Sequence, residues 1–456
     1  MTEELNNKIR SCFRSILATS ETESLKNFRN KGFRDFSASG FPSLKAEAWR
    51  HTPLKFLDNI NFNLRTVPDN FKVSSDEIAS FLLKEINENY VITLDGFYRD
   101  DLSKVSTKQN DLTICSLTSA FARYPEKLIQ CFDNSTGDYF NKTGEFTANE
   151  FSSLNEAMFN DGLFIDVPEN FADDAVLHIV HILDVRRKTG FCNTRTVISA
   201  GKHSHIRIIE SVHNLGSYAG FTNAVTEILG DDSSQIEYYK LQNDSEASYY
   251  IGSSNIKLGR DCTFEGVTVS LDGKFVRNNM NLELAGCGSD AKFYGFFFAT
   301  KDNFIDNHTT VDHAVADCKS YEAYKGIIDG KSNAVFNGRI LVRPDAQHTD
   351  AFQSNKNILL NDEAKVNSSP QLVIFADDVK CSHGTTTGYL DKESLLYMRS
   401  RGISESVAKS LLLNAFATDI INKIRISALC NEVKNLTAHR LNLEEELYFC
   451  NFADNH

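Results

Sequence analysis

The feature that most constrains the fold is a repeat of about 30 residues that runs through residues 160 to 380. A glycine or polar turn followed by a small residue recurs there, and the small residues are Ser204, Ser234, Cys262, Ala291, Ala334 and Ala364. Successive members lie 30, 28, 29, 43 and 30 positions apart. The step of 43 is close to one and a half of the others. A coil with two sides and a half-period of about 14 to 15 residues would explain it.

The stretches between these turns have strand character. Short apolar runs alternate with Gly, Asp, Asn and Ser, as in Val176–Leu183, Gln235–Leu241 and Thr263–Val269. A fixed period with small residues at the corners is typical of a solenoid whose coils stack tightly. The pattern therefore favours a parallel β-helix over a helical solenoid. An ordinary β-sandwich with coincidental spacing is the alternative.

The two flanking regions have helical periodicity instead. Apolar residues from Leu5 to Leu17 recur at spacings of three and four, and a second helix is expected over Glu23–Lys31, ending near Gly32. Near the C-terminus, Asp391 and Ser404 stand where N-caps belong and Gly402 where a C′ glycine belongs. The predicted plan is a helical and mixed domain over 1–160, a β-helix core over 161–388 and a helical domain over 389–456. For the tail 441–456 we expect only a short amphipathic or disordered end.

Composition and charge exclude several classes of protein. The 456 residues carry a net charge of −13, the opposite of what nucleic-acid binding requires. The N-terminus has no secretory signal pattern, and apolar runs are far shorter than the roughly 18 residues of a membrane span. We therefore expect a soluble, cytoplasmic protein whose ten cysteines are reduced. No Cys-x-x-Cys pair is present, which excludes zinc ribbons and thioredoxin-like sites.

Three groups of motif-like residues carry no convincing chemistry. Residues 326–332 resemble a P-loop but have three residues between the glycines where four are required, so we interpret them as a solenoid turn. Residues 286–291 mimic a dinucleotide fingerprint but precede a strand-like run rather than a helix. The histidines His178, His181, His203 and His205 are expected to be structural or surface groups, with His203 and His205 on one strand face.

Cys381 and His383 are different, because they are two residues apart and so share one face of a strand. A thiolate beside an imidazole is a ligand pair for iron or zinc, or a reactive-sulfur site. Lys380 and a protonated His383 would lower the pKa of the thiol. Two ligands do not complete a metal site, so the others must come from elsewhere, including from another chain.

The residues around this pair resemble a known family. Asp377-Asp378-Val379-Lys380-Cys381-Ser382-His383-Gly384 and the following residues to Ile403 resemble the C-terminal signature of the SufD family, subunits of the SUF iron–sulfur cluster assembly scaffold. The resemblance covers about residues 40 to 425. It includes Glu47-Ala48-Trp49-Arg50-His51-Thr52, Asp306-Asn307-His308-Thr309, Tyr324-Lys325-Gly326, Phe336-Asn337-Gly338-Arg339-Ile340 and Gln353.

The resemblance implies a right-handed parallel β-helix between helical domains, and a non-catalytic scaffold subunit. It implies pairing with a SufB-type paralogue through the β-helix and binding of a SufC-type ATPase through the helices at 391–425, with a homodimer when alone. His383 would be a ligand to iron of a transient iron–sulfur cluster, and Cys381 a second ligand or a sulfur relay. SUF complexes are also associated with reduced flavin, but no motif here supports a flavin site. A plastid stroma is the expected location if the host is eukaryotic.

Two other functions stay open at this point. One is a SufB-like main scaffold, against which the Cys-Ser-His-Gly segment at 381–384 and the Trp49 element argue. The other is a β-helix polysaccharide lyase or hydrolase, which would carry a long groove with clustered carboxylates and is usually exported.

Overall fold

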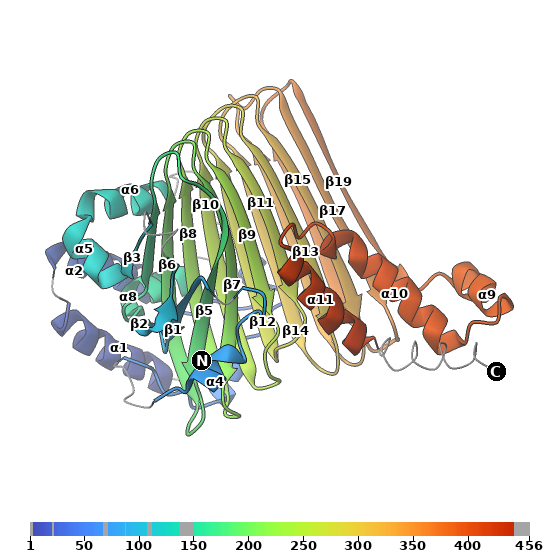
Figure 1. Cartoon of the computed structure of the whole chain (residues 1–456), viewed down its shortest axis with the longest axis horizontal. Helices are drawn as coiled ribbons and strands as arrows, with labels where there is room; N and C mark the ends of the chain where they lie inside the picture. Colours follow the sequence, from blue (N-terminus) through green and yellow to red (C-terminus); the bar gives the residue numbers. More distant parts are fainter. Residues whose placement is uncertain are drawn as a thin grey trace.

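The computed structural model describes residues 3–20, 22–66, 72–86, 88–106, 112–135 and 150–441. Its centre is a parallel β-solenoid made of two facing sheets, with helices at both ends of the sequence (Figure 1). The mainly β prediction with flanking helices is therefore confirmed. The tail 442–456, with Cys450, lies outside the described residues.

Each coil of the solenoid contributes one strand to each sheet. The ten-stranded sheet contains β1 (Tyr90–Leu94), β2 (Phe97–Lys104), β5 (Ala172–Asp184), β7 (His205–Leu215), β9 (Gln235–Gln242), β11 (Thr263–Ser270), β13 (Asp290–Ala299), β15 (Lys319–Ile328), β17 (Thr349–Leu359) and β19 (Val379–Tyr389). The nine-stranded sheet contains β3 (Thr113–Ser116), β4 (Leu163–Val167), β6 (Gly190–Ala200), β8 (Gly220–Gly230), β10 (Ser248–Leu258), β12 (Phe275–Leu284), β14 (Phe304–His313), β16 (Asn333–Val342) and β18 (Lys365–Ile374).

The repeat found in the sequence marks the corners of these coils. Ser204, Ser234 and Cys262 are buried and each precedes a strand of the ten-stranded sheet. The residue before each of them has a φ between 54° and 60°, which makes a left-handed corner. The step of 43 is a change of sheet, because Ala291 lies in β13 and Ala334 in β16. The half-period interpretation is confirmed.

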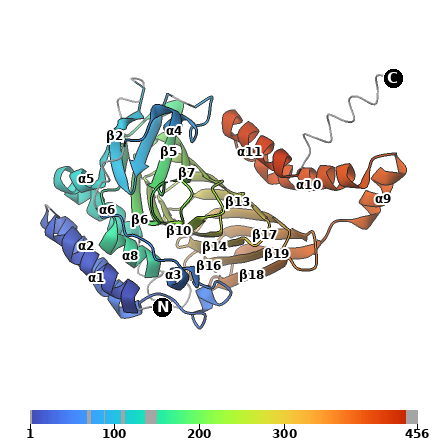
Figure 2. The same cartoon turned by 90° about the horizontal axis from the view of Figure 1, so that it is seen from below.

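N-terminal helices cover the outer face of the nine-stranded sheet (Figure 2). They are α1 (Glu3–Ala18), α2 (Glu23–Ser39), α3 (Phe56–Asn59), α5 (Leu117–Arg123), α6 (Pro125–Ser135) and α8 (Glu150–Met158), together with a 3-10 turn at Glu47–Trp49. A further short helix, α4 (Ser75–Ala79), packs beside β1. The prediction that the second helix ends near Gly32 is wrong. Gly32 lies inside α2, where its missing side chain lets the backbone of α8 approach closely.

The C-terminal region forms α9 (Lys392–Ser400), α10 (Glu405–Ile421) and α11 (Ser427–Arg440). The predicted caps are present, since the Asp391 side chain accepts from Glu393 and Ser394 and the Ser404 side chain accepts from Val407. Helices α10 and α11 pack on the outer face of the ten-stranded sheet, opposite the N-terminal helices (Figure 2). Among the described residues, no helix has the length and apolarity to cross a membrane.

The two ends of the solenoid differ. At the first end, β2 pairs antiparallel with β1, and β3 pairs antiparallel with β4. At the other end, β18 and β19 are the last strands of their sheets, and most of their residues are exposed or half-buried. The predicted Cys381–His383 pair therefore lies at the open end.

Candidate functional site

Cys381 and His383 lie on β19, the edge strand at the open end of the solenoid. In the parallel register with β17, Cys381 is beside Ala351 and His383 is beside Gln353. Both β17 residues are buried inside the solenoid. Because register partners in a parallel sheet share a face, the pair belongs to the interior row of the last coil that the structure describes.

The two side chains differ in accessibility. Cys381 is half-buried and packs against the interior cluster of the solenoid, whereas His383 is exposed. Burial raises the pKa of the Cys381 thiol, and the nearby Asp350 carboxylate adds to that rise. The pKa is thus raised, whereas the sequence predicted that Lys380 and a protonated His383 would lower it. Lys380 alternates to the other face of the strand, away from the thiol.

The opposite strand of the last coil contributes polar groups to the same end. The hydroxyls of Ser368 on β18 and Thr385 on β19 are 2.7 Å apart, and Ser368 donates to the Asn355 side chain at 2.8 Å. Ile374 and Phe375, which follow at the end of β18, are exposed by 39% and 56%. The end thus presents hydroxyls, an imidazole, a thiol and apolar groups that no part of the described chain covers.

Three other signature residues, Trp49, Thr52 and Asp306, converge elsewhere with Arg277, which is outside the quoted signature, in a contact that we call the anchor. Arg277 on β12 and Asp306 on β14 are fully buried and their side chains meet at 2.7 Å. Thr52 donates to the same Asp306 oxygen at 2.6 Å, and the guanidinium lies over the Trp49 ring at 3.8 Å. The anchor fastens the N-terminal segment to the nine-stranded sheet, and it is a structural contact rather than an exposed site.

A third group lies inside the solenoid one strand further in than β17, and the sequence did not single out its central residue. Glu322 on β15 is buried, and its carboxylate accepts from Thr309 at 2.6 Å and from Gln353 at 2.7 Å. Burial raises its pKa to about 7. Its spacing in the sequence could have found it. Glu322 is two residues from both Ser320 and Tyr324, so all three side chains share the interior face of β15.

The histidines that were expected to be structural are mostly so. His178 is buried, bonds to Ser211 at 2.8 Å and has its pKa lowered by burial to about 3. His181 is also buried and contacts Thr93 at 2.7 Å. His203 does not share a strand with His205, since its φ of 57° places it in a corner. Within the described ranges, no group of three or more His, Cys, Asp or Glu residues could hold a metal ion.

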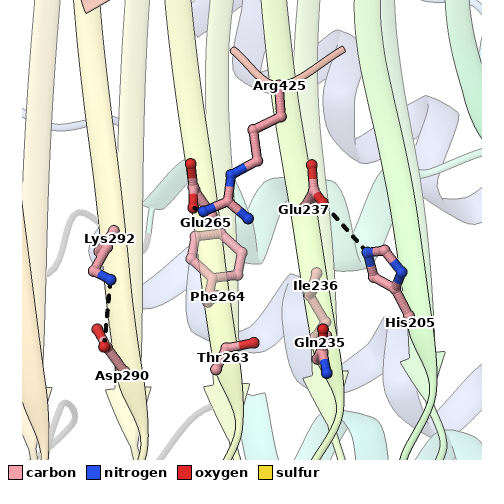
Figure 3. A pocket seen from close by; sticks show the side chains of 10 residues that line it. All are labelled: His205, Gln235, Ile236, Glu237, Thr263, Phe264, Glu265, Asp290, Lys292 and Arg425. Carbon is pink, nitrogen blue, oxygen red and sulfur yellow. Dashed lines mark hydrogen bonds and ion pairs between the residues drawn. The ribbon is translucent and has the colours of Figure 1, made fainter. Parts of the chain in front are cut away.

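A cavity of about 300 Å³ lies on the outer face of β7 to β13, beneath the connection between α10 and α11. Figure 3 shows carboxylates on successive coils, Glu237, Glu265 and Asp290, together with Lys292 and Arg425. A polysaccharide-active β-helix would need such carboxylates free. Here each is paired: Glu237 with His205 at 3.3 Å, Asp290 with Lys292 at 3.5 Å, and Glu265 with Arg425. Through Arg425 the cavity is part of the contact between the C-terminal region and this sheet.

Helix α9 is the least covered element of the C-terminal region. None of its residues is buried, and Leu396 and Tyr397 are 67% and 61% exposed. Helix α10 instead buries residues against the sheet and α11, and Lys325 on β15 donates to the Phe416 carbonyl at 3.0 Å. The segment predicted to bind a partner thus offers an apolar surface held beside the solenoid.

Comparisons with known proteins agree with this architecture. Residues 183–416 match the SufBD core domain of the SUF iron–sulfur cluster assembly system, and residues 8–179 match the SufBD N-terminal region. An iron–sulfur cluster assembly SufBD family protein of Synechocystis is 26% identical, covering 96% of each chain. The iron–sulfur cluster assembly protein SufD of Escherichia coli is 26% identical over 88% of this chain and 90% of its own length. The chloroplastic protein ABCI7 of Arabidopsis thaliana is 25% identical over 90% and 85%.

Proposed function

The chain belongs to the SufBD family, which serves iron–sulfur cluster assembly in the SUF system, and from this premise we propose that it is a SufD-type scaffold subunit. It performs no catalysis itself. The observation that carries the proposal is the Cys381–His383 pair on an open solenoid edge. The similarity to proteins named SufD favours this assignment over a SufB-like main scaffold.

In this proposal His383 offers a neutral imidazole to iron of the nascent cluster. Its exposure supports the role, because an iron ligand shared between chains must be reachable from outside. Cys381 is a second ligand or a sulfur relay. Iron binding would favour its thiolate and so overcome the pKa that burial raises. A SufB-type partner supplies the receiving thiolate and a carboxylate, which completes a site that this chain leaves incomplete.

The partners follow from the two uncovered regions. The SufB-type paralogue pairs through β18 and β19 at the open end, whose unpaired edges and exposed interior residues need a cover. The SufC-type ATPase binds the helices at 391–425, with Leu396 and Tyr397 on α9 as its first contacts. ATP-driven closure of two such ATPases would move these helices and expose the cluster site.

The remaining expectations stay proposals as well. In isolation the chain forms a homodimer through the same open end, where a second copy replaces the paralogue. We place the protein in the cytoplasm or a plastid stroma, the latter because a chloroplastic relative covers most of the chain. Flavin is left out, since no feature of the described residues supports it.

The ligand role is tested by His383→Ala in the reconstituted three-subunit complex, with cluster formation followed by visible absorbance. We expect a loss of at least about tenfold in cluster yield, as for removal of a metal ligand or its support. The control is His348→Ala, an exposed histidine at the same end that pairs with Asp317 and Asp378. A wild-type cluster yield from His383→Ala would contradict the ligand role. Alkylation of Cys381 that leaves assembly intact would reduce Cys381 to a packing residue.

The ATPase contact is tested with a Leu396→Ala, Tyr397→Ala double variant in a pull-down with the SufC-type subunit. Both side chains are mostly exposed, so the unfolding free energy should stay within about 0.5 kcal/mol while capture falls. The control is Leu44→Ala, which removes a leucine of similar exposure, 54%, from the N-terminal region. Unchanged capture by the double variant would remove α9 from the interface.

A further inference from the structure

Gln353 on β17 is the interior neighbour of His383. The register sets His383 beside Gln353 and Gln353 beside Glu322, so the three residues form one row across β19, β17 and β15. Gln353 and Glu322 are almost completely buried, and only the His383 end of the row opens to the outside. The row thus leads from the solenoid interior to the open end.

The two ends of the Gln353 amide are in different situations. Its nitrogen Nε2 donates to Glu322 Oε2 at 2.7 Å, and the other oxygen of Glu322 accepts from Thr309 at 2.6 Å. Above its pKa of about 7 the Glu322 carboxylate is an acceptor only, and in that state it fixes which end of the amide faces β15. The oxygen Oε1 of Gln353 is buried and has no hydrogen-bond partner in the part of the chain that the structure describes.

Gly338 on β16 gives the amide its place. A Cβ at this position would lie 2.3 Å from Gln353 Nε2, so no other residue leaves room for the side chain as it stands. Gly338 thus leaves room for the amide, and Glu322, which also accepts from Thr309, holds its nitrogen. The Gln353 side chain is therefore held in place although its oxygen Oε1 has no partner among the described residues.

A second interior glutamine, Gln242 on β9, is orphaned at the other end of its amide, since within the described residues its buried nitrogen Nε2 has no hydrogen-bond partner. The oxygen of Gln242 on β9 accepts from Ser270 at 2.6 Å and from Asn278 at 2.8 Å. The Gln353 oxygen accepts nothing, and a buried acceptor without a donor costs about 1 to 3 kcal/mol. His383 is the register neighbour on the open side of Gln353, and its ring N–H is a donor that would satisfy this oxygen.

We propose that Gln353 is a positioning residue for His383: its Oε1 accepts the N–H of one imidazole nitrogen and so leaves the lone pair of the other nitrogen for iron. The inference rests on the proposed ligand role of His383. Histidines that bind metals generally donate their second ring N–H to an oxygen acceptor, which fixes the tautomer and the ring orientation. In this chain the acceptor is an amide that the solenoid interior holds in place.

The test is the tautomer of His383 in the full chain, read from two-bond ¹H–¹⁵N spectra of protein with ¹⁵N-labelled histidine. His383→Ala identifies the signal. At pH 8, wild type should show one dominant tautomer, and Gln353→Met, which keeps the volume but removes the acceptor, should shift it toward a mixture. Gln242→Met is the matched control and should leave the His383 signal unchanged. An unchanged signal in Gln353→Met, or an equal change in both variants, overturns the proposal.

Gly338→Ala is the second variant, because it displaces the amide without changing its chemistry. It should shift the His383 tautomer in the same direction. The proposal therefore stays testable if Gln353→Met does not fold. An unchanged His383 signal in a folded Gly338→Ala protein counts against the proposal. In the reconstituted complex we expect Gln353→Met to slow cluster formation about tenfold. If His383→Ala leaves cluster formation intact while the tautomer result stands, the ligand role fails and the positioning geometry survives.

Discussion

Two regions carry stretches of the family signature, the anchor and the β19 edge, and they differ in almost every physical respect. In the anchor, Arg277 and Asp306 are fully buried, face each other and are joined by Thr52 and the Trp49 ring. On β19, His383 is exposed and Cys381 half-buried, and among the described strands β19 has a neighbour on one side only. One signature stretch thus lies in a contact made within the chain, and the other lies where we propose that a partner binds.

The two regions also differ in how they contribute to the free energy of folding. A buried ion pair needs all its hydrogen bonds, since breaking it leaves a charge away from water. An open strand edge costs the isolated chain little but invites pairing with other strands. Substitutions in the anchor should thus change stability, whereas substitutions on the edge should change assembly.

The largest effect should come from Arg277→Ala in the anchor. Asp306 would lose its fully buried guanidinium partner and Trp49 its stacked cation, so we expect a loss of about 3 to 5 kcal/mol in unfolding free energy. Urea denaturation measures it. The control is Lys380→Ala on β19, whose exposed side chain should cost less than about 0.5 kcal/mol. Similar losses of unfolding free energy in the two variants would contradict the difference in stability between the anchor and the β19 edge.

The next effect is a pH dependence from Glu322, just behind the β19 edge. Its folded-state pKa of about 7 is raised above the ordinary value of 4.5, so the folded chain holds the proton more tightly than the unfolded chain. The resulting stability is present below about pH 4.5 and is lost as the pH rises through 7.

Glu322→Gln removes this titration. The unfolding free energy of wild type minus that of the variant should therefore fall by up to about 3 kcal/mol between pH 4.5 and 7.5, at 1.36 kcal/mol per pKa unit. Urea denaturation at several pH values measures both proteins. A difference that stays flat with pH would mean that the fold does not raise the pKa of this carboxyl.

A smaller effect is expected for Gly32→Ala, on the covered side of the molecule. The new Cβ would lie 2.4 Å from the Glu156 Cβ and 2.8 Å from the Ala157 nitrogen, so α2 and α8 must separate. Overpacking of this kind costs about 1 to 3 kcal/mol, and the better helix propensity of alanine returns about 1 kcal/mol. Thermal unfolding should show a net loss. An increase in melting temperature would mean that the two helices are not in close contact.

The solenoid could be predicted from the sequence because its corners repeat. Small residues such as Ser204 and Ser234 follow left-handed turns at a fixed period. Such a local pattern can be recognised in the sequence alone. Gly32 was misread because a glycine in a helical pattern signals either an end or a close approach, and only the position of α8 decides between them.

The candidate site was predictable only in part. The spacing of Cys381 and His383 predicts one strand face, but the thiol pKa depends on how deeply β17 and the solenoid interior bury it. Glu322 escaped notice because a lone glutamate in a strand is usually exposed, and its burial follows from the parity of its strand. Residue spacing can be read from a sequence, whereas burial depends on how the coils of the solenoid stack.

The smallest effect on stability, and the sharpest test of the comparison, should come from Gly384→Ala on β19. No atom lies within 4 Å of where the new Cβ would stand, in contrast to the crowded Gly32. Alanine should leave the unfolding free energy unchanged or raise it by about 0.5 kcal/mol, because it restricts the unfolded chain. If a partner strand covers this edge, the same methyl group should weaken capture of the SufB-type subunit. Wild-type stability with reduced capture would separate the open edge from the anchor, whereas a marked loss of stability in the isolated chain would show that the edge is already packed.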